Sequence, residues 1–180
     1  MANNIQWKLD EAHSEVTFKV RHLMISNVKG EFKDFNADVQ TNGEDFSTAK
    51  VSFNIQTDSI DTRNNDRDNH LRSADFFDSE NHKSMHFQST SVEKKDDESY
   101  ILNGDLTIRD VTKPIQLNVD FGGIVTDPWG NQKAGFSVDG KINRKEWGLN
   151  WNASLEAGGV LVGETVNIAC ELELYKPKGE

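Results

Sequence analysis

The sequence predicts an all-β fold in which about eight antiparallel strands close into an up-and-down barrel. Apolar and polar residues alternate in segment after segment, as in strands with one buried and one solvated face. Little of the chain has helical periodicity, so helices are not available to cover the apolar face of a sheet. Such strands form either a sandwich or a closed barrel, and segments of about 7–10 residues suit a barrel of about eight strands.

Segments with this alternation follow one another along the chain. The clearest are residues 16–20, 51–55, 100–108, 115–121, 134–142 and 166–174. Weaker alternation at 5–9, 28–39 and 85–92 adds three candidates, so we expect about eight or nine strands. Three glycine-containing pairs are typical of turns between strands: Asn103-Gly104, Gly122-Gly123 and Gly158-Gly159.

The segment from Thr57 to Ser84 interrupts this pattern, because few of its residues are apolar. Residues 63–71 predict one or two turns of helix, with an Asn or Asp side chain available to cap the first turn. A loop of this length in a compact domain is usually functional or disordered. The aromatic pair Phe76-Phe77 indicates that this loop packs onto the barrel.

The composition limits the classes of partner. The 180 residues fit one domain, spanning 1–180, and carry a formal net charge of −10 with a pI of about 4.9. A chain this acidic repels nucleic-acid phosphates and gains little from anionic lipid surfaces. We therefore expect neither a nucleic-acid partner nor stable membrane insertion, and a ligand that is uncharged, apolar or small.

Signals for targeting and for disulfides are weak. No apolar run approaches the ~18 residues of a membrane span, and the first residues lack the basic start and apolar stretch of a signal peptide. We expect a cytoplasmic protein, or a periplasmic one if a signal was removed. The single cysteine, Cys170, excludes an intramolecular disulfide. It alternates in phase with Ile168 and Leu172, so we expect a buried and unreactive thiol.

Several short motifs, in their order and spacing, resemble the YceI family of lipocalin-like, polyisoprenoid-binding proteins. The motifs are Trp7 to Asp10, His13-Ser14, Phe18 to Met24, Gly30 to Phe35, Arg67 to Phe76, Gly104 to Thr107, Val111 to Pro114, Asp127 to Gly130 and Ala134 to Phe136. The resemblance implies an extended, lipocalin-like antiparallel barrel with short helices. It also implies a long apolar channel for an isoprenoid or fatty-amide chain, and a homodimer.

The in-phase positions of the strands supply the residues expected to contact a ligand. The expected wall residues are Phe18, Phe53, Leu106, Leu117, Phe136 and Ile168, and the expected lid residues of the long loop are Leu71, Phe76 and Phe77. Val20 and His22 point inward near the end of their strand, where the histidine needs a polar partner. Trp147 and Trp151 either close one barrel end as a core plug or line the ligand entrance.

Residues that could support metal binding or catalysis do not form convincing motifs. The spacing of His82 and His86 is poor for a metal site, and Asp66, Asp68 and His70 lack the glycine and the terminal glutamate of a calcium loop. The sequence also contains no nucleophile elbow. We expect no metal, no cofactor and no catalytic residue.

Three functional hypotheses remain. The first is a non-enzymatic carrier for a polyisoprenoid, an isoprenoid quinone or a fatty amide, held within the barrel. The second is an enzyme or stress-response catalyst that uses the same pocket, with His22 as its proton-transfer residue. The third is a filled barrel that serves as a protein-interaction module.

Overall fold

The computed structural model describes residues 3–156 and 158–177, and most of these residues lie in strands. The strands are β1 (Asn4–Leu9), β2 (Glu15–His22), β3 (Ser26–Phe32), β4 (Phe35–Asn42), β5 (Asp45–Gln56), β6 (Ile60–Asp61), β7 (Ser84–Lys94), β8 (Ser99–Ile108), β9 (Val111–Thr126), β10 (Gln132–Asn143) and β11 (Val162–Lys176). The helical elements are η1 (Glu11–His13), η2 (Thr57–Ser59), η3 (Arg144–Trp147) and α1 (Asn65–Arg72). The all-β prediction is confirmed.

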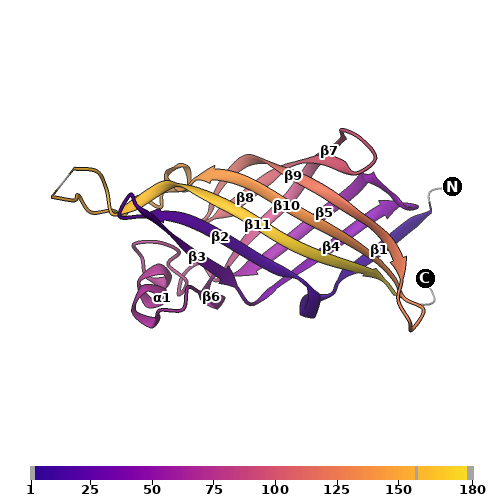
Figure 1. Ribbon diagram of the computed structural model, residues 1–180, viewed down its shortest axis with the longest axis horizontal. Helices are drawn as coiled ribbons and strands as arrows, with labels where there is room; N and C mark the ends of the chain where they lie inside the picture. Colours follow the sequence, from indigo (N-terminus) through magenta and orange to yellow (C-terminus); the bar gives the residue numbers. More distant parts are fainter. Residues whose placement is uncertain (1–2, 157, 178–180) are drawn as a thin grey trace.

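The strands close into an eight-stranded antiparallel barrel. Three of its eight positions are each filled by two shorter strands that lie end to end: β1 with β2, β3 with β4, and β5 with β6. β1 and β2 both pair with β11, one after the other, on either side of η1. In the same way, β3 pairs with β2 while β4 pairs with β1, so β3 and β4 lie end to end. β5 pairs with β4 while β6 pairs with β3, so β5 and β6 also lie end to end. Figure 1 shows the resulting long barrel, with α1 at one end and both chain termini at the other.

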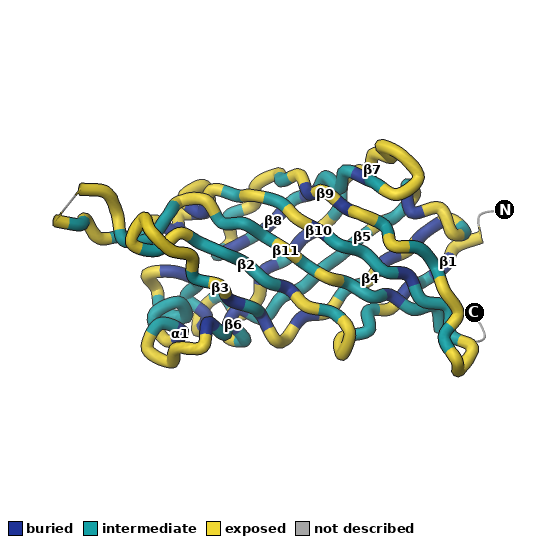
Figure 2. Tube along the Cα trace, in the orientation of Figure 1, coloured by how far each residue is buried: buried dark blue, intermediate teal, exposed yellow. Residues whose placement is uncertain are grey.

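The inward faces of the strands form the core, in the phase that the alternation predicts. Trp7, Ala134 and Trp147 are at most 1% exposed, and Val39 and Leu174 are also buried. Figure 2 shows this pattern as buried and half-buried stretches along the strands, with exposed residues at the turns and loops. The barrel therefore has a mainly apolar interior and a polar outer surface.

The helix expected at residues 63–71 is present as α1. The Asn64 side chain caps it by accepting a hydrogen bond from the backbone N–H of Arg67 at 3.0 Å. Asp68, which is buried, accepts hydrogen bonds from the backbone N–H and the hydroxyl of Thr62. The Arg67 Nε atom donates to the same hydroxyl at 2.7 Å. These contacts anchor the helix to the end of β6.

Two of the three predicted turns are wrong, because their glycines lie within strands. Gly104 lies inside β8, where the Phe87 ring covers it: a Cβ atom on Gly104 would lie 2.3 Å from that ring. Gly122 and Gly123 lie inside β9, where the pairing with β10 shifts register between Gly135 and Phe136. Gly123 has a φ of +108°, so this pair forms a β-bulge.

The hairpin between β8 and β9 turns instead at Arg109 and Asp110. Both residues have positive φ angles, 51° and 64°, and Ile108 pairs directly with Val111. A two-residue turn with positive φ at both positions matches the right-handed twist of the flanking strands. The third predicted turn pair, Gly158-Gly159, lies in the loop between η3 and β11.

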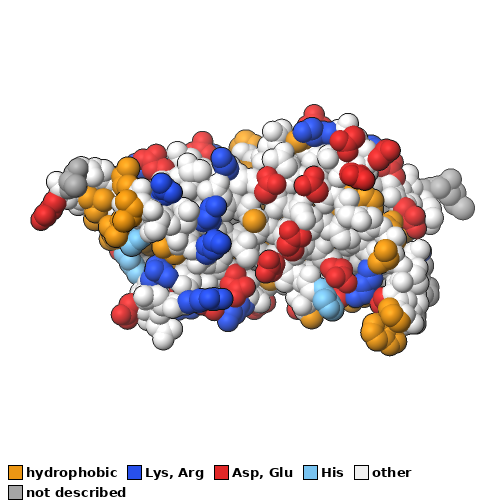
Figure 3. Space-filling view, in the orientation of Figure 1, with side chains coloured by type: hydrophobic (Ala, Val, Ile, Leu, Met, Phe, Trp, Pro, Cys, Tyr) orange, Lys and Arg blue, Asp and Glu red, His pale blue; other side chains and the backbone are white. Residues whose placement is uncertain are grey.

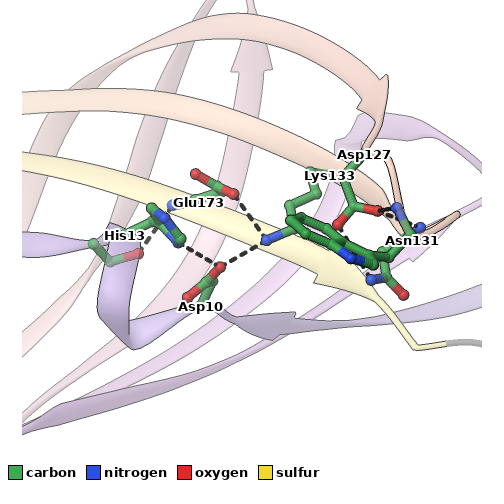
Figure 4. A network of polar contacts seen from close by, with 8 residues as sticks. Asp10, His13, Asp127, Asn131, Lys133 and Glu173 are labelled. Carbon is green, nitrogen blue, oxygen red and sulfur yellow. Dashed lines mark hydrogen bonds and ion pairs between the residues drawn. The ribbon is translucent and has the colours of Figure 1, made fainter.

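A network of charged side chains ties the barrel together near the chain termini (Figure 4). The Lys133 Nζ atom, on β10, lies 2.7 Å from Asp10 Oδ2 and 3.1 Å from Glu173 Oε1 on β11. His13 Nδ1 lies 2.9 Å from the same Asp10 oxygen. The hydrogen bond from Lys133 holds the pKa of Asp10 below its ordinary value, and His13 acts in the same direction. The two carboxylates raise the pKa of Lys133.

We predict that Asp10→Asn lowers the free energy of unfolding at neutral pH by about 1 kcal/mol, a small effect because the pair is close to solvent. The pKa of Asp10 is lower in the folded protein than in the unfolded chain. Its contribution is therefore complete above the unfolded pKa and is lost as the pH falls through the folded pKa. Urea unfolding from pH 7 downward should show the two proteins converging below about pH 4. A constant difference at all pH values would contradict this assignment.

Gly104→Ala should destabilise the protein by about 1–3 kcal/mol, because the added methyl group meets the Phe87 ring and the Gln88 carbonyl oxygen. Gly135→Ala is the matched control, since a Cβ atom there has no neighbour within 4 Å. We expect the control to change the unfolding free energy by less than about 0.5 kcal/mol. Chemical denaturation of both variants measures the difference, and equal stabilities would show that Phe87 does not pack over Gly104.

Candidate functional site

The barrel encloses a cavity of about 440 Å³ at the end where α1 lies. Inward residues of β2, β3, β7, β8, β10 and β11 form its wall, and the long loop with α1 forms the remaining side. Most of the lining side chains are aliphatic or aromatic. A volume of this size lies within the range of ligand-binding cavities.

The structure brings together nine of the thirteen residues expected to contact a ligand. The nine that line this large cavity are Phe18, Val20, His22, Leu71, Phe76, Phe77, Leu106, Trp151 and Ile168. Phe53 and Phe136 line a separate cavity of about 80 Å³ nearer the termini. Leu117 and Trp147 are buried and line neither of these two cavities.

Two large side chains separate the cavities by packing over glycines. Phe87 packs over Gly104 on β8, where Leu102 lines the small cavity and Leu106 the large one. Leu117 packs over Gly140 on β10, since a Cβ atom on that glycine would lie 2.5 Å from Leu117 Cδ2. We call Phe87 and Leu117, with the glycines beneath them, the partition. The interior is therefore divided, in place of the continuous channel that the family resemblance implies.

The two tryptophans left open by the sequence have different positions. Trp147 is 1% exposed, and its Nε1 atom donates a hydrogen bond to the Leu106 carbonyl at 2.9 Å, so it is a core residue. Trp151 lines the large cavity. Its ring centroid lies 4.5 Å from that of His70 and 5.6 Å from that of Phe76. Trp151 therefore links the loop before β11 to the long loop.

The long loop packs onto the barrel as expected. Phe77 makes an edge contact with Phe32 of β3, with 5.7 Å between ring centroids. The carbonyl of Phe76 accepts a hydrogen bond from Arg109 Nη1 at 2.9 Å, and the Phe76 side chain is 6% exposed. The loop, which follows β6 in the chain, thus supplies the aromatic side chains of Phe76 and Phe77 to the cavity wall.

One end of the large cavity lies at the end of β2. On β2, Phe18 is followed by Val20 and then by His22 at the strand end. Val162 pairs with His22 and also lines the cavity, so we call this end the mouth. Arg67 and His70 line the cavity from α1, where Arg67 donates hydrogen bonds to Thr62 and His70 Nε2 lies 2.9 Å from Asp75.

Arg144 is a lining residue that the sequence analysis missed, because its polar neighbours gave no periodic signal. It is 3% exposed, and desolvation lowers its pKa while Glu164 acts in the opposite direction. Its guanidinium carbon lies 5.9 Å from the centroid of the Phe76 ring. Its hydrogen bonds go to the backbone carbonyls of Leu149, Trp151, Val162 and Gly163. Arg144 therefore holds the loop carrying Trp151 against β11.

Among the described residues, the side chains close enough together to share a metal ion lie outside the large cavity. Asp10, His13 and Glu173 are close enough to share an ion, but the Lys133 ammonium already contacts both carboxylates. A lysine in this place supplies the positive charge that a metal would bring.

The histidines and acids considered from the sequence have separate partners. His86 hydrogen-bonds to Asn54 at 2.8 Å, whereas His82 lies near Asp78 and Asp110. Asp68 is engaged by Thr62, and His70 Nε2 lies 2.9 Å from Asp75. These contacts give each group a structural role.

Comparisons with known proteins give a consistent result. A family model described as a YceI-like domain matches residues 7–174. A UPF0312 protein of Staphylococcus epidermidis is 43% identical over 171 residues, covering 93% of this chain and 96% of the relative. The crystal structure of a Campylobacter jejuni YceI protein has a TM-score of 0.76 at 35% identity, covering 94% of this chain and 96% of that one.

A more distant structure shares only the fold. It is a polyisoprenoid binding domain from Saccharophagus degradans, with a TM-score of 0.67 at 15% identity, covering 96% of this chain and 99% of that one. In the described residues of our protein, none of the helices has the length and apolar character needed to cross a membrane.

The Cys170 thiol should react slowly in the native protein. Burial raises its pKa to about 12, so only about one thiol in ten thousand is ionised near pH 8. The control is Ala169→Cys in a Cys170→Ala background, which moves the thiol to the neighbouring exposed position. Labelling with a chromogenic disulfide reagent should be fast for this control and slow for the wild type. Equal rates would show that the β11 register is wrong.

Proposed function

This chain belongs to the family of YceI-like domains, and from that premise we propose that it binds one long apolar molecule and carries it chemically unchanged. The observation that carries the proposal is the large cavity, about 440 Å³ in volume and lined mainly by apolar side chains. Candidate ligands are a polyisoprenoid, an isoprenoid quinone or a fatty amide. The polyisoprenoid binding named for the Saccharophagus degradans domain supports a ligand of this class, although that protein shares only the fold.

Burial of the chain supplies the binding energy. Each methylene group removed from water contributes about 0.8 kcal/mol, so about ten buried groups contribute roughly 8 kcal/mol. That free energy corresponds to a dissociation constant of about 1 μM, before the cost of ordering the chain is subtracted. Micromolar or tighter binding therefore needs few polar contacts.

The distribution of polar groups gives the ligand a direction. The partition and the aliphatic residues near it, such as Leu106 and Ile168, suit the apolar tail. His22 lines the cavity at the mouth, where it suits a hydroxyl, carbonyl or other polar head. A buried polar group on the ligand would then find a hydrogen-bonding partner, as burial requires.

The catalytic alternative has less support. His22 does line the cavity, but its backbone carbonyl is the group that accepts hydrogen bonds, from the backbone N–H of Ile25 and from Ser26 Oγ. The imidazole is not part of those bonds, whereas a general base is normally held in place by a further group. The open cavity also argues against a filled barrel that serves only as an interaction module.

Organic extraction of the purified protein followed by mass spectrometry tests the proposal. We expect one class of long apolar molecule, recovered chemically unchanged after incubation and readily exchanged for added polyprenols of suitable length. The Trp151 indole lines the cavity, so its fluorescence should change as the ligand binds. Absence of any ligand and of any polyprenol binding would refute the carrier, and conversion of the ligand to a product would favour the enzyme.

The partition should determine the longest chain that binds. Leu117→Ala removes part of the partition and should join the two cavities, so that longer polyprenols bind while short ones bind as before. Leu172→Ala is the matched control, because Leu172 lines only the small cavity. Each substitution should cost about 2–5 kcal/mol of stability, so folding is checked first. If both folded variants keep the wild-type length limit, the ligand does not reach the partition.

A further inference from the structure

An exposed apolar surface lies beside the mouth of the large cavity. Its side chains are Leu23, Met24 and Ile25 of the β2–β3 hairpin, which are 40%, 52% and 80% exposed, and Val160, which is 37% exposed. We call these four residues the apolar tip. The backbone N–H of Leu23 donates to the Leu161 carbonyl at 2.9 Å, which joins the hairpin to the loop before β11. Figure 3 shows hydrophobic side chains gathered at this end of the molecule.

The backbone of the hairpin presents these side chains at a conformational cost. Leu23 and Met24 have φ angles of 53° and 63°, in the left-handed region that large apolar residues rarely adopt. Glycine or asparagine would suit these positions better. Strain of this kind is often found where a segment has a function, and here it exposes apolar side chains to water.

A row of lysines crosses the outer face of the sheet next to the apolar tip. Lys29 pairs with Lys19 across β3 and β2, Lys19 pairs with Asn167 on β11, and Asn167 pairs with Lys141 on β10. We call these four residues the lysine row. Like charges placed directly opposite each other, as Lys19 and Lys29 are, destabilise a sheet. Arg21 adds a further positive charge two positions closer to the tip on the same face.

Acidic residues occupy the same face beyond the lysine row, toward the termini. Glu31 and Asp139 lie two positions farther along their strands, and Glu15 pairs with Glu171 farther still. Figure 3 shows blue side chains next to the apolar end and most red ones beyond them, with a few red side chains also at the apolar end. Around the tip itself, residues 22–28 and 151–162 contain one acidic residue, Glu156. Glu164, on β11 between Val162 and Asn167, is an acidic residue nearer the tip, and it lies 2.9 Å from Lys145 Nζ. Most of the charge is therefore segregated along this face even though the net charge is −10.

We propose that the apolar tip and the lysine row dock the protein on an anionic lipid bilayer. The tip would enter the headgroup region and the lysines would meet the lipid charges, which places the cavity mouth at the surface. At physiological ionic strength charges are screened beyond about 8 Å, so the local basic charge acts despite the acidic total. The inference goes beyond ligand binding, because it names the surface at which the ligand is exchanged.

Two other possibilities fit the charges less well. In a two-fold dimer whose axis passes through the lysine row, the row of one copy would meet that of the other. An axis between the row and the acidic residues would instead oppose lysines and carboxylates, so sedimentation of the Ile25→Ser variant, described below, tests for a dimer on this face. At the opposite barrel end, Trp129 and Val125 are also exposed, by 74% and 65%. The charges near that hairpin include Asp127, Asp10 and Glu173, which an anionic bilayer would repel.

Co-sedimentation of the full chain with vesicles tests docking. Binding should be strong to phosphatidylcholine vesicles that contain phosphatidylglycerol, weak to phosphatidylcholine alone, and reduced by high salt. Ile25→Ser should lower the affinity by about tenfold, since one apolar side chain is no longer buried. Lys19→Gln with Lys29→Gln should lower it by about fivefold per lysine.

Matched controls test whether the location of the substituted residues matters for vesicle binding, or only the loss of an apolar or a basic side chain. Val125→Ser removes an exposed β-branched side chain at the other end, and Lys50→Gln with Lys113→Gln removes two exposed lysines from other strands. The controls should bind vesicles like the wild type. Docking is refuted if the wild type ignores anionic vesicles, if the controls lose as much binding as the tip variants, or if Ile25→Ser instead dissolves a dimer in sedimentation.

Extraction of the ligand, as described above, distinguishes the docking proposal from the carrier proposal. Ile25→Ser lies outside the cavity lining and should retain extractable ligand. Loss of vesicle binding with ligand retained supports docking as a separate property. Anionic-vesicle binding by a protein that neither yields a ligand nor binds polyprenols would overturn the carrier proposal and leave docking supported.

Discussion

Closure of the sheet through β11 is the constraint on which the rest of the structure depends. β11 pairs along one edge with β10 and divides its other edge between β1 and β2, on either side of η1. This ring leaves inward side chains with no route to solvent except at the ends, so one face of every strand becomes an interior. The Lys133 network lies beside this junction. Its ion pairs connect β10 to Glu173 on β11 and to Asp10, the residue after β1.

Within that ring, glycine positions decide where space remains. Gly104 and Gly140 carry no side chain, so Phe87 and Leu117 can lie across the interior and fill the middle of the barrel. Beyond this partition, the long loop takes the place of strand pairing between β6 and β7 and contributes aromatic rings to the cavity wall. A cavity results because flat rings and a loop fill this end less completely than paired strands do.

The chemical character of the molecule changes along its long axis. The termini end holds a small cavity, acidic outer residues and a network of ion pairs. The other end holds the large cavity, a buried Arg144 that braces the Trp151 loop, and an apolar tip beside a lysine row. The proposed carrier function and the proposed docking at a lipid surface both use this second end. A mouth at the membrane would let an apolar chain move into the barrel without crossing water.

The sequence by itself determined the fold class, the family and most strands, because period-two alternation records which side chains face inward on every strand. It also predicted α1, since Asn64 is a recognisable cap. Tertiary structure alone decided the size of the cavity. Phe53, Phe136 and Leu117 are in phase with the true lining residues, but phase gives no depth along the barrel axis, and the partition separates them. Arg144 and the lysine row likewise come from residues far apart in sequence, which only strand register brings together.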